Sequence, residues 1–123
     1  MIIGIGTDLI EVSRFEKSIS KPRFLEKVFT EQELELCGHK QSRVQSLAAR
    51  FAAKEACMKA LGTGWSEGVS FSEIEVLNNS QGAPVMVLHG TTQQRAQELG
   101  VENIHITLSH LHEIASATVI LEK

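Results

Sequence analysis

The sequence has only two cysteines and no apolar run long enough to cross a membrane. Two cysteines are too few for a disulfide framework, and Cys57 falls in a helical stretch without metal-type spacing around it. We therefore expect reduced thiols and a cytoplasmic protein. The first twelve residues lack a basic start and reach an acid at Asp8, so we expect neither a signal peptide nor a membrane anchor.

A basic excess is also absent. Lys and Arg number 12 against 15 Asp and Glu, a formal charge of -3, which argues against a general nucleic-acid partner. The charge is uneven, however, because the segment from Ser13 to Val28 has five basic residues and only two acids. By itself such a run is typical of a solvated helix face.

The chain of 123 residues, 42% hydrophobic, fits one domain covering residues 1–123. A domain of this size buries a smaller share of its surface than a larger one does. Association into an oligomer would enclose more apolar area, so we expect an oligomer.

Helical signals dominate the first half after an initial strand. An isoleucine-rich run, Ile2 to Val12, predicts a buried strand that ends near Asp8. Thr30 and Glu33 have the spacing of a capping box at the start of a helix. The segment from Ser42 to Leu61 contains no Pro or Gly and many alanines, and Gly62 follows as a stop, so it predicts the longest helix.

The second half favours strands. A helix is expected from Thr91 to Leu99, ending at Gly100. Four runs have strand character: 74–77, 84–88, 104–108 and 115–121. This order predicts an α+β fold in which a small, mainly antiparallel sheet packs on the long helix.

A charged pair lies on the long helix. On a helical wheel, Glu55 and Lys59 fall at the seam between a bulky apolar face and a stripe of alanines. They would be partly buried if both faces pack, and charges are rarely buried without a reason. The alternative is a solvated i,i+4 pair that stabilises the helix by roughly 0.2–0.5 kcal/mol.

Asp8 strengthens the first interpretation, because an acid at the expected end of an apolar strand can project from the rim of the sheet. If Asp8 and Glu55 converge to about 4 Å, they repel by on the order of 4 kcal/mol at an effective dielectric of 20, which calls for a cation or a shared proton. Mg²⁺ suits such a pair, since it takes one or two carboxylates and completes its shell with water and phosphate. Asp8 could instead cap a turn.

Two separated motifs carry a resemblance to a known family. Ile5-Gly6-Thr7-Asp8, followed by the segment FAAKEACMK at residues 51–59, resembles the two-part signature of the phosphopantetheinyl transferase superfamily. The stretches GTDLIEVSRF, RFAAKEACMKALGTG and HITLSHLHEIASATVILE resemble the short, single-domain holo-acyl-carrier-protein synthases of that superfamily over nearly the whole chain.

The resemblance implies a fold, an activity and a set of roles. The chain would transfer 4'-phosphopantetheine from coenzyme A to a serine of an apo acyl carrier protein, releasing 3',5'-ADP in support of fatty acid biosynthesis, as a homotrimer with its sites between subunits. Asp8 and Glu55 would hold Mg²⁺, and with Lys59 they would form the catalytic group. Coenzyme A would be bound by residues matching family positions: Arg50, Lys59, Gly62, Ser109 and His110.

Three further points follow from the family interpretation. Carrier proteins are acidic around the modified serine, so the basic segment becomes the expected docking patch, with Arg14, Lys21 and Arg23 at its centre. The general base would be Glu55, a metal-bound water that it orients, or His110. Trp65 fits either a core position or the wall of a nucleotide pocket.

Two other functions use the same residues. A small nucleotide-binding regulatory domain would keep the polar seam without turnover. A metal-dependent phosphohydrolase would use the two carboxylates with water as nucleophile.

Overall fold

The computed structural model describes residues 1–63 and 69–123, so Trp65 lies outside the described residues. The elements of this part follow the order β1 (Ile2–Glu11), α1 (Val12–Ile19), α2 (Pro22–Val28), α3 (Glu31–Cys37), α4 (Arg43–Leu61), the short 3-10 helix η1 (Phe71–Glu73), β2 (Ile74–Asn78), β3 (Pro84–Leu88), α5 (Gly90–Leu99), β4 (Asn103–His110) and β5 (Ile114–Glu122). The predicted α+β class and the four predicted strands of the second half are confirmed.

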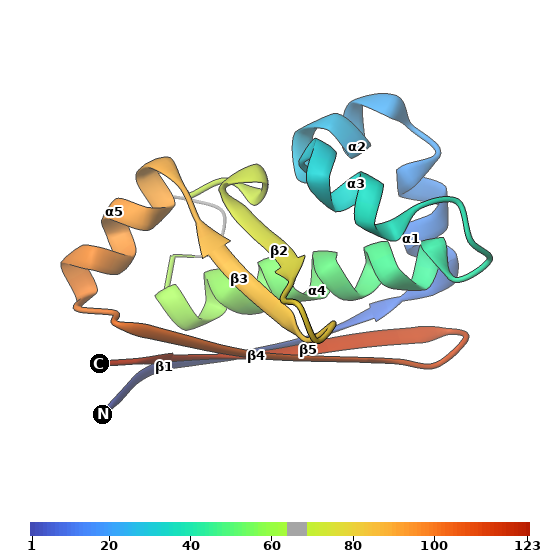
Figure 1. The fold of residues 1–123 in the computed structure, drawn as a ribbon. Coiled ribbons are helices and arrows are strands. Elements are labelled where there is room, and N and C mark those ends of the chain that lie inside the picture. The colour runs from blue at the N-terminus through green and yellow to red at the C-terminus, as the bar shows by residue number, and fades with distance from the viewer. Residues whose placement is uncertain (64–68) are drawn as a thin grey trace.

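Helix α4 lies between two layers of the molecule (Figure 1). A three-stranded antiparallel sheet in the order β1-β5-β4 covers one side of it. Helices α1 to α3 and the antiparallel hairpin β2-β3 lie on the other side, and α5 lies beyond the hairpin. Most of the core therefore packs around α4, whose alanines allow close approach from both sides.

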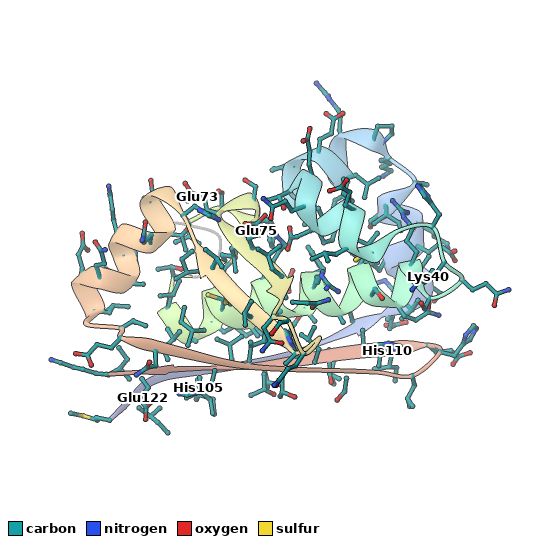
Figure 2. The ribbon with its side chains drawn as sticks, in the orientation of Figure 1. Lys40, Glu73, Glu75, His105, His110 and Glu122 are labelled. Carbon is teal, nitrogen blue, oxygen red and sulfur yellow. The ribbon has the colours of Figure 1, made fainter. Side chains whose placement is uncertain are left out.

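The outer face of the three-stranded sheet has no covering element among the described residues (Figure 1). Ile5 and Leu9 are 64% and 72% exposed on this face. Ile5 pairs with Ile120, which in turn pairs with His105. The ring of His105 contacts Glu122 at 2.9 Å, and both lie along the lower edge of the sheet in Figure 2.

Strand β1 differs from the sequence prediction in two ways. It does not end near Asp8 but continues to Glu11, because β5 pairs with it over this whole length, with Asp8 opposite Ala117. It is also not buried on both faces, since its residues alternate between α4 and the open side. The isoleucine-rich composition indicated a strand, but the one-sided burial depends on which faces other elements cover.

The two strongest helix signals are confirmed. Helix α4 ends at Gly62, which adopts a left-handed conformation (φ 75°), and its N–H donates to the carbonyls of Met58 and Lys59. At the start of α3, the Thr30 hydroxyl accepts from the Glu33 N–H, and the Glu33 carboxylate accepts from the Thr30 N–H. No helix in the described part of the chain is both long and apolar enough to span a membrane.

Candidate active site

Two glycines let β1 lie directly against the backbone of α4. A Cβ atom on Gly6 would come 1.9 Å from the carbonyl oxygen of Ala56, and one on Gly4 would come 2.1 Å from that of Ala60. No side chain fits in this space. Asp8 follows Gly6 by two residues on the same face of the strand, so the contact brings its carboxylate to the middle of α4.

Asp8 meets both charged residues of the predicted helix seam. Its Oδ1 atom accepts a hydrogen bond from Lys59 Nζ at 2.9 Å, and Nζ also donates to the Thr7 carbonyl at 2.9 Å. The Asp8 side chain is 11% exposed, whereas that of Lys59 is 55% exposed. The structure therefore brings together Asp8, Glu55 and Lys59, but from within β1 and not from the rim of the sheet. Lys59 was expected to be partly buried at the seam, but its side chain is exposed to solvent, because no element in residues 1–63 and 69–123 covers its end.

The two carboxylates are close enough to affect each other's charge. Burial first, and then the Asp8 carboxylate, raise the pKa of Glu55 to about 7, while Lys59 opposes the rise. When Glu55 is protonated, it can donate this shared proton to Asp8, which also raises the pKa of Glu55. Near neutral pH Glu55 thus alternates between its protonated and its ionised form.

The same two acids fit a magnesium ion. Asp8 Oδ2 is buried and has no hydrogen-bond donor among the described residues, so one carboxylate oxygen stays free for a cation. No group of three or more His, Cys, Asp or Glu side chains with metal-binding geometry occurs in residues 1–63 and 69–123. A pair is enough for Mg²⁺ when substrate phosphates and water supply the other ligands, as they do at many phosphoryl-transfer sites.

Arg50 and His110 lie elsewhere. Both line a hollow of about 320 Å³ between α4, β4 and the β2-β3 hairpin. Arg50 is buried, and its guanidinium donates to the Val76 carbonyl and to Asn78 Oδ1, both at 3.2 Å. It lies about 140° around the helix from Glu55. Within one chain, Arg50 and His110 therefore do not converge with Asp8 and Glu55.

The other predicted ligand positions are divided between two faces. Ser109 is exposed and belongs to the set of β4 residues that alternate onto the open face of the sheet, opposite Ser116. Gly62 closes α4, and no atom of the described residues lies within 4 Å of the position of its missing Cβ. Gly62 follows the helix turn that carries Lys59.

The predicted docking residues are all exposed around the first two helices. Arg14 lies on α1 and contacts Glu11 at 3.7 Å. Lys21 precedes α2, and Arg23 lies on it. A hollow of about 320 Å³ separates β1, α1, α2 and α4 and is lined by Phe15, Phe24 and Phe51 with other residues, Arg14 among them.

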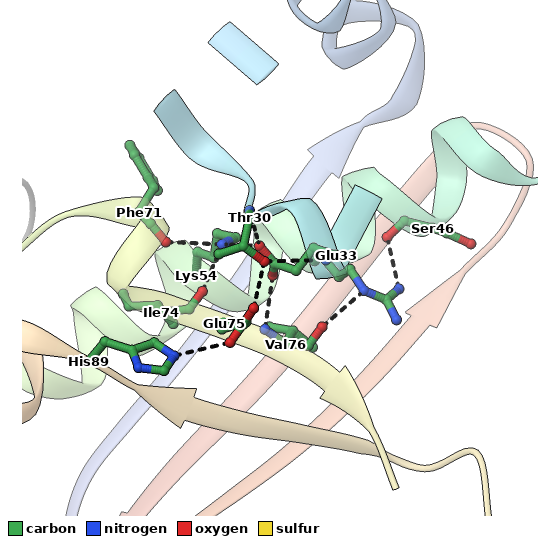
Figure 3. Close-up of polar contacts among 10 residues, drawn as sticks. Thr30, Glu33, Ser46, Lys54, Phe71, Ile74, Glu75, Val76 and His89 are labelled. Atoms are coloured by element: carbon green, nitrogen blue, oxygen red, sulfur yellow. Dashed lines mark hydrogen bonds and ion pairs between the residues drawn. The ribbon is translucent and has the colours of Figure 1, made fainter. Parts of the chain in front are cut away.

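A buried polar network on the other side of α4 was not predicted from the sequence (Figure 3). Lys54 and Glu33 form an ion pair of 2.8 Å in which both side chains are fully buried. Glu75 accepts from the Thr30 hydroxyl at 2.6 Å and contacts the His89 ring at 3.0 Å. The signal for this network was the adjacency of Lys54 and Glu55 in the sequence. Two neighbouring residues point about 100° apart on a helix, so on a helix that is buried on both sides they face different layers.

Neither cysteine adds a nucleophile to the site. Cys37 and Cys57 are free and buried. Burial raises the pKa of the Cys57 thiol to about 12, so it is not a thiolate near neutral pH. The reactive groups of the site are thus the two carboxylates and the lysine.

An α+β domain in which an acid pair lies beside a lysine ammonium suits a protein that binds phosphate groups together with a divalent cation. Residues 4–117 match the family model of the 4'-phosphopantetheinyl transferase superfamily. The chain belongs to this superfamily and is a transferase of the holo-[acyl-carrier-protein] synthase group.

Three similar proteins illustrate the match, and each is a holo-[acyl-carrier-protein] synthase. The chain is 46% identical over 125 residues to the holo-[acyl-carrier-protein] synthase of Maridesulfovibrio salexigens, which covers 100% of both chains. It resembles the crystal structure of the Bacillus anthracis synthase in complex with CoA (3',5'-ADP) at 41% identity and a TM-score of 0.82, over 98% of this chain and 96% of the other. For the synthase of Neisseria meningitidis, the identity is 32% and the TM-score 0.90 over all of both chains.

Proposed function

We propose that this chain transfers the 4'-phosphopantetheine group of coenzyme A to a serine hydroxyl of an apo acyl carrier protein and releases 3',5'-ADP. The observation that carries the proposal is the Asp8–Glu55 pair, half-buried beside the exposed ammonium of Lys59. Relatives that share 41–46% identity over nearly the whole chain are named for this reaction, and one of them is a complex with CoA.

The reaction forms a bond between the serine oxygen and the β-phosphorus of coenzyme A and breaks the bond from this phosphorus to the bridging oxygen. Negative charge grows on the leaving 3',5'-ADP. Lys59 can offset this charge because its ammonium is exposed and turns from Asp8 to a phosphate by side-chain rotation alone.

Asp8 and Glu55 would hold Mg²⁺ on the pyrophosphate. When bound, the ion would neutralise the phosphate oxygens and fix their orientation. Asp8 offers its free Oδ2 atom, and Glu55 loses its shared proton when a cation takes the place of that proton. The ionised Glu55 is then the nearest group that can accept the serine proton, and we assign it as general base or as the residue that orients a water in this role. His110 is assigned to ligand binding, because it lines the same hollow as the cationic Arg50.

The distance between the acid pair and the hollow that contains Arg50 and His110 supports a site shared between two copies of the chain. Arg50 and His110 lie on the far side of α4 from Glu55, so a second copy must supply them if they contact the same coenzyme A. The open sheet face, with Ile5 and Leu9 exposed, provides apolar area for such an assembly. We propose a homotrimer in which Arg50, Ser109 and His110 of one subunit complete the Asp8–Glu55–Lys59 site of the next, with Gly62 close to the nucleotide.

The basic surface of α1 and α2 would dock the carrier protein. Arg14 follows the end of β1 by three residues, so the patch begins close to the strand that holds Asp8. An acidic carrier helix on Arg14, Lys21 and Arg23 would thus present its serine near the acid pair. The free, buried thiols agree with a reducing cytoplasm as the place of this reaction.

One experiment separates this function from its rivals. The protein is incubated with coenzyme A, Mg²⁺ and an apo acyl carrier protein, and the carrier is weighed by mass spectrometry. We expect a gain of one phosphopantetheinyl group. Release of 3',5'-ADP with an unmodified carrier would show a phosphohydrolase instead, and binding of coenzyme A without any product would show a nucleotide-binding domain.

A further inference from the structure

Lys54 is a fully buried lysine whose three ammonium protons all have acceptors (Figure 3). Nζ donates to Glu33 Oε1 at 2.8 Å, to the Phe71 carbonyl at 3.0 Å and to the Ile74 carbonyl at 2.7 Å. The three acceptors belong to α3, η1 and the first residue of β2. One side chain of α4 therefore fixes three separate segments of the layer opposite the sheet.

The contact of α4 with β1 has a different character. Gly4 and Gly6 lie against the backbone of Ala56 and Ala60, and neither glycine has a side chain that could interlock with the helix. At these two positions the contact sets the distance between strand and helix but does little to fix the rotation of the helix about its own axis. Directional bonds on the other side of α4 can fix this rotation.

Among the fully buried directional contacts of α4, those of Lys54 lie nearest to Glu55 along the chain. Glu55 is the next residue, about 100° further around the helix, so whatever fixes Lys54 also fixes the direction of Glu55. A rotation of α4 by about 10° would move an atom at the side-chain tip, roughly 6 Å from the axis, by about 1 Å. A misplacement of this size can cost on the order of 100-fold in rate.

We propose that Lys54 is a positioning residue for the transfer reaction: by binding the Phe71 and Ile74 carbonyls, it holds α4 in the rotation that keeps Glu55 facing Asp8. This inference rests on the proposed function for its kinetic consequence. It assigns to Lys54 a task beyond neutralising Glu33, and the two tasks can be separated by substitution.

The test uses a double variant that removes the ammonium without leaving an unpaired buried charge. In Lys54→Met/Glu33→Gln both charges are absent, whereas Glu33→Gln alone keeps the bonds of Lys54 to the two carbonyls. Met58→Ala is the matched control, because Met58 is 2% exposed one turn further along α4 and has no part in the site. All three variants and the wild type are compared at a temperature at which each is folded by circular dichroism.

We expect the double variant to lose on the order of 100-fold in kcat with a KM for coenzyme A within about threefold of the wild type. Glu33→Gln and Met58→Ala should lose stability but keep kcat within about threefold. Titration with Mn²⁺ alone, in the absence of substrate, should show about tenfold weaker binding to the double variant only, since its two carboxylates no longer converge.

Two results would overturn the inference: a kcat for the double variant equal to that of Met58→Ala, or an equal loss of kcat in Glu33→Gln. A wild type that binds Mn²⁺ but modifies no carrier would contradict the proposed function and not the role of Lys54. In that case the Mn²⁺ affinities of the variants decide whether Lys54 sets the geometry of the acid pair.

Discussion

Lys54 and Glu55 are neighbours on α4, yet their charges are satisfied to different degrees. Lys54 has a full set of acceptors and an opposite charge at 2.8 Å. Glu55 faces another acid, and its pKa is raised. A buried charge that is fully paired serves structure, whereas one held against a like charge is available for a cation or a proton. The difference supports the proposal that Glu55 is the member of the pair that takes part in the reaction.

The pKa of Glu55 gives a prediction for stability. Because it is raised to about 7 in the folded protein, ionised Glu55 disfavours folding, and this loss grows between its ordinary value of 4.5 and about pH 7. Without divalent cations, Glu55→Gln should therefore be about 1 kcal/mol more stable than the wild type at pH 8. This value is smaller than the full pKa shift implies, because solvent screens the half-exposed carboxylate. At pH 5 the two proteins should be nearly equal in stability. Urea unfolding in EDTA at both pH values measures this. A constant difference would show that neither burial nor Asp8 raises the pKa of Glu55.

Lys59 should act mainly on the chemical step. Its ammonium is exposed, and the charge that it offsets grows only as the leaving group departs. Lys59→Ala should thus lower kcat by on the order of 100-fold and change the KM for coenzyme A less. The control is Lys40→Ala, which removes an exposed lysine from the connection between α3 and α4 (Figure 2). An effect of Lys59→Ala confined to the KM would make Lys59 a phosphate anchor only.

At the level of elements, the contact between β1 and α4 decides whether the site exists. Gly6→Ala places a methyl group 1.9 Å from the Ala56 carbonyl oxygen, so strand and helix must separate. We expect a loss of about 3 kcal/mol in unfolding free energy, together with most of the transfer activity. Thr7→Ala, on the neighbouring position and the other face, is the stability control and should cost about 1 kcal/mol through its hydroxyl bond to Ala117. Equal losses would contradict the steric argument.

The sequence predicted elements well where a signal is local. The capping box at Thr30 and the glycine after Leu61 correctly placed the start of α3 and the end of α4. The extent of β1 was wrong, because it depends on β5, more than 100 residues away.

For the site, the signature in the sequence named Asp8, Glu55 and Lys59, and the structure brings these three together. The buried ion pair of Lys54 and Glu33 was missed, since helical periodicity places charges on faces but does not show which faces become covered.

At the level of the whole molecule, a shared site predicts complementation between damaged subunits. His110→Glu would repel phosphate, and Glu55→Gln removes a carboxylate; each variant alone should be nearly inactive. Mixed trimers should recover about one third of wild-type activity, because one of the three interfaces in each then combines two intact halves. Co-expression with two affinity tags and sequential purification supplies the mixed assembly for the assay. An assembly with no recovered activity would place all the residues of one site in one chain.

The basic surface predicts how the carrier protein docks. Reversing Arg14 and Lys21 to Glu should raise the KM for the carrier about tenfold or more and leave that for coenzyme A unchanged. Wild-type association should weaken as salt shortens the Debye length to about 8–10 Å and below, and the reversed variant should lose most of this salt dependence. Stopped-flow association over a salt series measures both, with Lys40→Glu as control. If the wild type and the reversed variant had equal kinetics with the carrier at low salt, Arg14 and Lys21 would only be part of a solvated helix face.

The pairing of β1 with β5 also governs when the enzyme can first work in a growing cell. In the three-stranded sheet, β5 is the neighbour of β1, and the Thr7 hydroxyl binds Ala117, 110 residues further on. During synthesis, the strand that carries Asp8 leaves the ribosome more than 100 residues before β5, its partner in the sheet. A ribosome-bound chain that lacks β5 should thus hold no acid pair. The nascent protein should stay inactive until β5 has left the ribosome.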